Sequence, residues 1–174
     1  MNTANKLTML RVILIPAFLA VLYIGFEGNQ YVALAIFAIA SLTDFADGWI
    51  ARNRDQVTDF GKFMDPLADK VLVVAALLWF TQQGLMPAWA VLIVIIREFA
   101  VTALRLVAVD KGRVIAAGTS GKIKTASTMA CIILMFLPVP QLLIHICVGI
   151  IVLVTLYSGV EYFVKNKELL NWTK

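Results

Sequence analysis

The chain has 174 residues, of which 61% are hydrophobic and 15% charged, and its mean hydropathy is +0.87. Soluble domains are roughly 45–50% apolar and about 25% charged, so this composition excludes an ordinary soluble domain and indicates a membrane protein. A formal charge of +4 would suit nucleic acid, but the basic residues stand at the ends of apolar segments rather than in one continuous stripe. Cys131 and Cys147 stand singly in apolar segments, which predicts buried apolar side chains rather than metal ligands.

The sequence offers six apolar segments, each close to the roughly 20 residues that a membrane-spanning helix needs. The first follows an amphipathic lead-in and resembles a signal peptide, but no small-residue cleavage site follows it, so we expect a retained helix. No internal repeat or linker separates the segments, which predicts a single transmembrane domain over residues 1–174. The predicted helices cover about residues 10–26, 31–52, 59–80, 88–109, 119–137 and 141–164.

The positions of the basic residues predict the orientation in the membrane. All 15 Lys and Arg lie at the N-terminus, in the second-to-third or fourth-to-fifth connection, in the C-terminal tail, or in helices leading to these places. The turns near Glu27, Gln83 and Pro138 carry none. The positive-inside rule then places both termini in the cytoplasm. We therefore expect an all-α integral membrane protein with six transmembrane helices.

Six of the 11 acidic residues lie between Thr43 and Lys70, among segments as apolar as membrane spans. Four of them fall at helical spacings, namely Asp44, Asp47, Asp65 and Asp69. A membrane protein keeps charges at such depth only where they are paired, hydrated or functional. The short loop between the second and third helices makes these helices antiparallel neighbours. We therefore expect the four carboxylates to converge in a pocket that opens to the cytoplasm.

Converging negative charges repel strongly where the dielectric is reduced, so either some carboxylates are protonated or a divalent cation neutralises them. All-carboxylate ligation suits Mg²⁺ or Mn²⁺, and the lone His145 on the far side of the membrane disfavours zinc. Because Mg²⁺ usually shares its protein ligands with substrate phosphates, a pyrophosphate substrate would complement the site. Gly48, Ala51 and Gly61 leave room for a ligand, although small residues also serve close helix packing. Arg52 could pair with a phosphate or a carboxylate.

The segment DFADGWIAR and, eight residues later, the segment GKFMDPLAD carry eight fixed residues. At every fixed position they resemble the signature of the CDP-alcohol phosphotransferase family. The resemblance implies a six-helix membrane protein, commonly a homodimer. It also implies the transfer of a phosphatidyl group, or a related phospho-alcohol, from a CDP-linked donor to an alcohol with release of CMP.

The same resemblance implies a role for each motif residue. Two divalent ions would be bound by Asp44, Asp47, Asp65 and Asp69. The CDP part of the donor would lie along Asp44, Asp47, Gly48, Ala51 and Arg52, with Gly61 lining the same site. Asp69 would be the base that activates the acceptor hydroxyl. Metals that bridge the pyrophosphate would neutralise charge on the transferred group and on the departing CMP.

A second basic group lies outside the signature and consists of Arg97, Arg105, Lys122 and Lys124. Arg97 lies roughly 21 Å along its helix from Lys111, which is too deep for a simple interfacial anchor. Buried cations beside a pyrophosphate site favour an acceptor that bears its own phosphate. Arg97, with Glu98 beside it, could instead be structural.

Three further segments, NKLTMLRVILIPAF, IIREFAVTALR and SGKIKTAS, are similar to bacterial phosphatidylglycerophosphate synthases, so the resemblance covers most of the chain. It implies CDP-diacylglycerol and sn-glycerol 3-phosphate as substrates, and the inner (cytoplasmic) membrane as the location. Another acceptor remains open, as in cardiolipin or phosphatidylinositol phosphate synthesis. A divalent-cation transporter is the alternative from a different class, but it would need a polar path to the outer face, which residues 31–42 and 71–79 do not offer.

Overall fold

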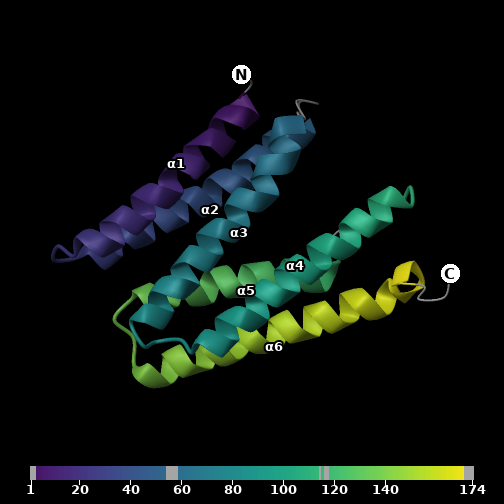
Figure 1. Ribbon diagram of the computed structural model, residues 1–174. Helices are drawn as coiled ribbons and strands as arrows, with labels where there is room; N and C mark the ends of the chain where they lie inside the picture. Colours follow the sequence, from purple (N-terminus) through teal and green to yellow (C-terminus); the bar gives the residue numbers. More distant parts are fainter. Residues whose placement is uncertain (1–2, 54–58, 114, 116–117, 171–174) are drawn as a thin grey trace. The chain divides into compact units, whose positions relative to one another are not determined.

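The computed structural model describes residues 3–53, 59–113, 115 and 118–170. For residues 3–8, 44–53, 59–63, 65–66 and 169–170 it describes the backbone alone. These parts of the chain form six α-helices and one short 3-10 helix (Figure 1). The elements are α1 (Thr3–Ile24), α2 (Asn29–Asn53), α3 (Asp59–Gln82), α4 (Ala88–Asp110), α5 (Thr119–Phe136), α6 (Gln141–Lys165) and η1 (Lys167–Leu170).

The predicted helices are confirmed, with ends that differ by a few residues. The beginning of the chain is the exception, because α1 starts at Thr3 and the predicted lead-in belongs to the same continuous helix. Polar residues are suited to the first turn of a helix, because the backbone N–H groups there have no intrahelical partner and bond to water or side chains instead. The helix also continues through Pro16.

The first of two compact units, Met1–Ala76, contains α1, α2 and most of α3. The helices α1 and α2 pack against each other and bury Phe18 and Phe37, whose ring centroids lie 6.1 Å apart. Between these helices the chain turns at Gly28, which has the positive φ of +79° that glycine adopts without strain. The Asn29 amide donates a hydrogen bond of 3.0 Å to the carbonyl of Leu22 near the end of α1. This bond satisfies one of the free carbonyls at that helix end.

The second unit, Leu77–Lys174, contains the end of α3 together with α4, α5, α6 and η1. Within it, α6 packs against both α4 and α5. The ring of Phe136 lies 5.6 Å from that of Trp79 and 4.7 Å from that of Phe80. A second buried cluster is formed by Val101, Leu104, Ala108 and Tyr162, with Ile115 and Phe163 packed against it. Because these contacts join α4 to α6, they fix the part of α4 that carries basic residues.

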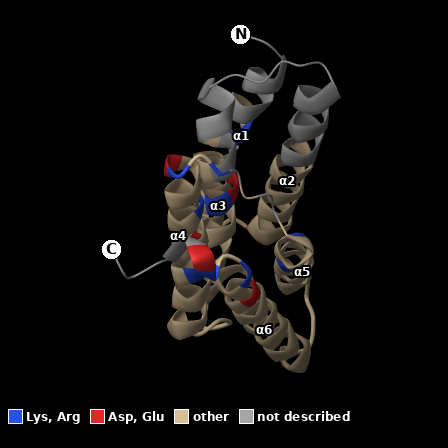
Figure 2. Ribbon diagram, turned by 90° about the vertical axis from the view of Figure 1, so that its right-hand side faces the viewer, with Lys and Arg blue, Asp and Glu red and all other residues tan. Residues whose placement is uncertain are grey.

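Among the described helices, α6 is long and apolar enough to cross a membrane. It has 25 residues, its most apolar stretch has a mean hydropathy of 2.3, and only 33% of that stretch is buried within the protein. Its two charged residues, Glu161 and Lys165, lie near its C-terminal end, and the rest of the helix carries no Asp, Glu, Lys or Arg (Figure 2). Met9–Ile24 and Asn29–Thr43 are shorter apolar helical stretches. The structure is therefore all-helical with one clear candidate for a membrane-spanning helix, and the six spans stay a prediction.

Candidate active site

The aspartate motif lies on two helices, as its spacing predicts. Asp44 and Asp47 fall within α2, and Asp65 and Asp69 fall within α3. Residues three or four apart on a helix share a face, so each helix carries one pair of carboxylates about one turn apart. The side chains of Asp44, Asp47 and Asp65 lie outside the described residues. The convergence of the four carboxylates therefore remains a prediction.

The other motif residues divide in the same way. The backbones of Gly48, Ala51 and Arg52 are helical in α2, and that of Gly61 is helical in α3, while nothing is described of their side chains. Asp69, the predicted base, is half-buried and lies between the buried Ala68 and Leu72. Among the described side chains, no group of three or more His, Cys, Asp or Glu could hold a metal ion, and three of the four predicted ligands are not among them.

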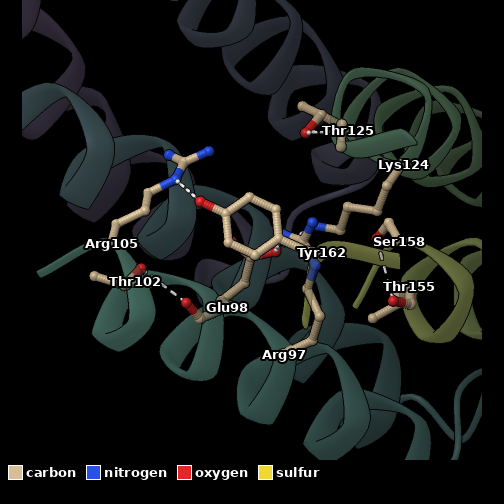
Figure 3. Close-up of polar contacts among 10 residues, drawn as sticks. Arg97, Glu98, Thr102, Arg105, Lys124, Thr125, Thr155, Ser158 and Tyr162 are labelled. Carbon is tan, nitrogen blue, oxygen red and sulfur yellow. Dashed lines mark hydrogen bonds and ion pairs between the residues drawn. The ribbon is translucent and has the colours of Figure 1, made fainter. Parts of the chain in front are cut away.

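The structure brings two of the predicted acceptor-binding cations together on one carboxylate (Figure 3). A single oxygen of Glu98, Oε1, lies 2.9 Å from an Arg97 terminal nitrogen and 2.7 Å from the Lys124 ammonium. The three side chains are only 13%, 15% and 7% exposed for Arg97, Glu98 and Lys124. These residues, which we call the Glu98 triad, join α4 to α5 and carry two positive charges against one negative charge.

Two glycines make room for the Arg97 side chain between α5 and α6. A Cβ atom built on Gly159 would lie 3.2 Å from Arg97 Cγ, and one built on Gly121 would lie 3.7 Å from an Arg97 terminal nitrogen. The hydroxyls of the buried Thr128 and Thr155, and Arg97 Nε, make no hydrogen bond to any residue that the structure describes. Arg97 also lines a pocket with Ile93, Ile96 and Leu156, so its charge lies among mostly apolar side chains.

The other two predicted cations are exposed. Arg105 Nε donates a hydrogen bond of 3.0 Å to the hydroxyl of Tyr162, and its guanidinium carbon lies 5.6 Å from the centre of the tyrosine ring. Lys122 is exposed one turn inside α5. The four predicted residues thus form two groups, with Arg97 and Lys124 held by Glu98 and with Arg105 and Lys122 accessible.

Two contacts in this region were not predicted from the sequence. The sequence allows an Arg97–Glu98 pair because the two residues are adjacent, but the Lys124–Glu98 contact joins residues 26 positions apart. Tyr162 is separated from Arg105 by 57 positions. The sequence shows only that a tyrosine lies in the last turn of an apolar helix, close to Lys165. This position does not indicate which residue the tyrosine contacts.

Paired carboxylates on α2 and α3, in an all-helical protein with an apolar α6, fit a membrane-bound transferase that acts on a phosphate substrate. The chain belongs to the CDP-alcohol phosphatidyltransferase family, whose sequence pattern matches residues 1–158. The family that the motif indicated is therefore confirmed. Tyr162 lies beyond the matched residues.

The chain is also similar over most of its length to several known proteins. It is 43% identical to CDP-diacylglycerol–glycerol-3-phosphate 3-phosphatidyltransferase from Bacillus subtilis, over 97% of both chains. It is 40% identical to a probable phosphatidylglycerophosphate synthase from Mycobacterium tuberculosis, over 92% of this chain and 79% of that one. The protein from Escherichia coli with the same name as the Bacillus protein is 38% identical over 75% of this chain and 74% of its own.

Proposed function

We propose that the protein transfers the phosphatidyl group of CDP-diacylglycerol to sn-glycerol 3-phosphate, giving phosphatidylglycerophosphate and CMP in phospholipid biosynthesis. The observation that carries this proposal is the 43% identity, over 97% of both chains, to a protein named for this reaction. In the reaction, the acceptor hydroxyl oxygen bonds to the phosphatidyl phosphorus, and the bond from that phosphorus to CMP breaks. The hydroxyl proton passes to a base, and CMP leaves with the bonding electron pair.

The aspartate motif supplies the donor side of the proposed reaction. Its four carboxylates fit hard divalent cations, because all are oxygen donors and each helix carries a pair one turn apart. Two ions, Mg²⁺ or Mn²⁺, would neutralise charge on the pyrophosphate when bound. The proposed metal ligands are Asp44, Asp47, Asp65 and Asp69, and the proposed donor-binding residues are Asp44, Asp47, Gly48, Ala51, Arg52 and Gly61.

Asp69 is the proposed base. Its side chain is half-buried, so its carboxylate keeps some access while its surroundings exclude part of the water. A carboxylate within hydrogen-bond reach of the acceptor hydroxyl takes the proton as the oxygen attacks. This role makes Asp69 the residue of the motif whose charge matters directly to the chemical step.

The basic residues of α4 and α5 supply the acceptor side. Arg105 and Lys122 are exposed and would contact the acceptor's phosphate directly. Lys124 and Arg97 already bind Glu98, so their part is the net positive charge that the Glu98 triad adds to this region. An acceptor that lacks a phosphate would gain nothing from either group, which favours glycerol 3-phosphate over a neutral alcohol.

The proposal includes the arrangement in the membrane. The distribution of all 15 basic residues supports six spans with both termini in the cytoplasm. It also agrees with an active site that faces the cytoplasm and with an inner-membrane location. Homodimer formation is carried over from the resemblance to the family, and a single domain is proposed because the sequence shows no internal repeat or linker. Labelling of single cysteines in the turns near Glu27 and Gln83 from outside intact cells would test the topology, and labelling only from the inside would contradict it.

CMP release by the purified protein tests the reaction. The protein in detergent receives CDP-diacylglycerol and Mg²⁺ or Mn²⁺, with glycerol 3-phosphate, phosphatidylglycerol, inositol phosphate or no acceptor in separate reactions. Among the acceptors, we expect only glycerol 3-phosphate to raise CMP release above the level without acceptor. The acceptor assignment is wrong if glycerol 3-phosphate gives no more CMP than the reaction without acceptor.

A further inference from the structure

We infer that Tyr162 is a positioning residue, which holds the Arg105 guanidinium in the orientation that binds the acceptor's phosphate. The inference rests on the proposed function and adds to it a residue outside both the aspartate motif and the part of the chain that the family pattern matches. It is carried by the burial of Tyr162, its contact with Arg105, and the difference between Arg105 and Arg97.

Tyr162 is fixed by its surroundings. It is only 7% exposed, and its ring belongs to the buried cluster with Val101, Leu104 and Ala108 of α4. Phe163, the next residue of α6, packs against the same cluster. A buried aromatic ring with neighbours on several sides has little rotational freedom, so the direction of its hydroxyl is set by the packing of α4 against α6.

The tyrosine holds Arg105 through one nitrogen and leaves the other two available. Nε donates to the Tyr162 hydroxyl at 3.0 Å, and the guanidinium carbon lies 5.6 Å from the ring centre. The two terminal nitrogens of Arg105 point away from the tyrosine (Figure 3). These two nitrogens form the fork that binds a phosphate with two parallel hydrogen bonds.

Holding the side chain in advance has an energetic consequence. A free arginine on a helix surface samples many rotamers, and binding a phosphate would restrict them at a cost in affinity. Arg105 is exposed, so without Tyr162 nothing in the described part of the chain would fix its guanidinium. The Tyr162 hydroxyl therefore reduces the conformational entropy that the Arg105 side chain loses when glycerol 3-phosphate binds.

Arg97, in the same helix, is a guanidinium that is paired with a carboxylate. One of its terminal nitrogens is bound to Glu98 at 2.9 Å, so its positive charge is already shared with a carboxylate. The hydrogen-bond partner of Arg105 is an uncharged hydroxyl, which orients the group without cancelling its charge. Arg105 is therefore better suited than Arg97 to bind a phosphate directly.

Tyr162→Phe tests the inference because it removes one oxygen atom and keeps the ring in its cluster. We expect the KM for glycerol 3-phosphate to rise roughly 3- to 10-fold, as for the loss of one ordinary hydrogen bond, while kcat changes less than about twofold. The KM for CDP-diacylglycerol should stay the same. A merely structural effect of the substitution would change both KM values or lower the thermal stability instead.

Three further variants make the result specific. Tyr157→Phe, at an exposed position of the same helix, should leave both KM values unchanged. In an Arg105→Leu background, Tyr162→Phe should add nothing, because the leucine side chain has no N–H to donate to the hydroxyl. Tyr162→Met is the substitute if Tyr162→Phe proves too unstable to purify, because methionine fills the cluster but has no hydroxyl. It should raise the KM for glycerol 3-phosphate in the same way.

The outcomes separate this inference from the proposed function. If the wild-type protein releases no CMP in response to glycerol 3-phosphate, the proposed function fails and the inference fails with it. If the wild-type protein is active and Tyr162→Phe leaves the acceptor KM unchanged, or adds its full effect to Arg105→Leu, the inference alone is overturned.

Discussion

The Lys124 ammonium of α5 lies 2.7 Å from Glu98 Oε1 of α4, and the two side chains are 7% and 15% exposed. Arg97 binds the same oxygen, so one carboxylate holds two cations in the interior of the second unit. Burying charged groups is costly unless they are paired and hydrogen-bonded, and Glu98 provides that pairing for both cations. The contact therefore explains how two of the four predicted acceptor-binding residues can be largely buried.

Glu98→Gln should destabilise the protein because it leaves Arg97 and Lys124 without a compensating charge. Removing one partner of a buried ion pair costs roughly 3 kcal/mol, and the Tm of the purified protein in detergent should fall accordingly. Glu168→Gln is the matched control, since Glu168 is 80% exposed and lies 3.9 Å from an exposed Arg113. Equal Tm values for Glu98→Gln and Glu168→Gln would contradict the structural role of the Glu98 triad.

Gly159→Ala should disturb Arg97, because the added methyl group would lie 3.2 Å from Arg97 Cγ. Alanine stabilises a helix by about 1 kcal/mol relative to glycine. The stability of Gly159→Ala is therefore compared with that of the same substitution at a glycine with space around it. Gly149, also in α6, is such a glycine, because a Cβ atom added there would meet no described heavy atom within 4 Å. We expect Gly159→Ala to be less stable than Gly149→Ala by roughly 1 kcal/mol in denaturant unfolding. Equal or greater stability of Gly159→Ala would show that Arg97 moves freely.

Asp69→Asn should remove most of the turnover, because an amide cannot take the proton of the acceptor hydroxyl. The loss of a general base lowers kcat by roughly 100-fold or more. The initial rate of CMP release at saturating substrates measures this effect. Asp110→Asn, at the exposed end of α4, should keep wild-type turnover. Near-full activity of Asp69→Asn would overturn the assignment of the base.

Removing divalent cations should stop the reaction. Excess EDTA should abolish glycerol 3-phosphate-dependent CMP release, and added Mg²⁺ or Mn²⁺ should restore it, because carboxylate ligands favour these hard ions. In a metal titration, Asp44→Asn should need a higher concentration of the ion for half-maximal activity than the wild-type protein. Activity that persists in EDTA, with metal content verified on the same sample, would contradict the metal assignment.

The local features of the chain could be predicted because they depend on residues close together in the sequence. Asp44 and Asp47 are three positions apart and Asp65 and Asp69 are four apart, so helix geometry alone relates the members of each pair. The helix ends follow from turns rich in glycine, proline and polar residues, as at Gly28 and Pro87. The family also followed from the motif, because eight fixed residues lie within one short segment.

The contacts between helices could not be predicted in the same way. Lys124 and Glu98 are 26 positions apart, and Arg105 and Tyr162 are 57 apart. Which faces of α4, α5 and α6 meet depends on side-chain packing over the whole unit, and the spacing of basic residues carries no information about it. The prediction of one basic group therefore combined residues that the structure separates into a largely buried pair and an exposed pair.

Product identification with labelled acceptor tests the central claim most directly. The purified protein is incubated with CDP-diacylglycerol, Mg²⁺ and glycerol 3-phosphate labelled in its carbon atoms, and the lipid extract and the released CMP are quantified together. We predict one labelled lipid that carries two phosphates, formed in equal amounts with CMP and absent with Asp69→Asn. CMP release without label in the lipid fraction would contradict the account.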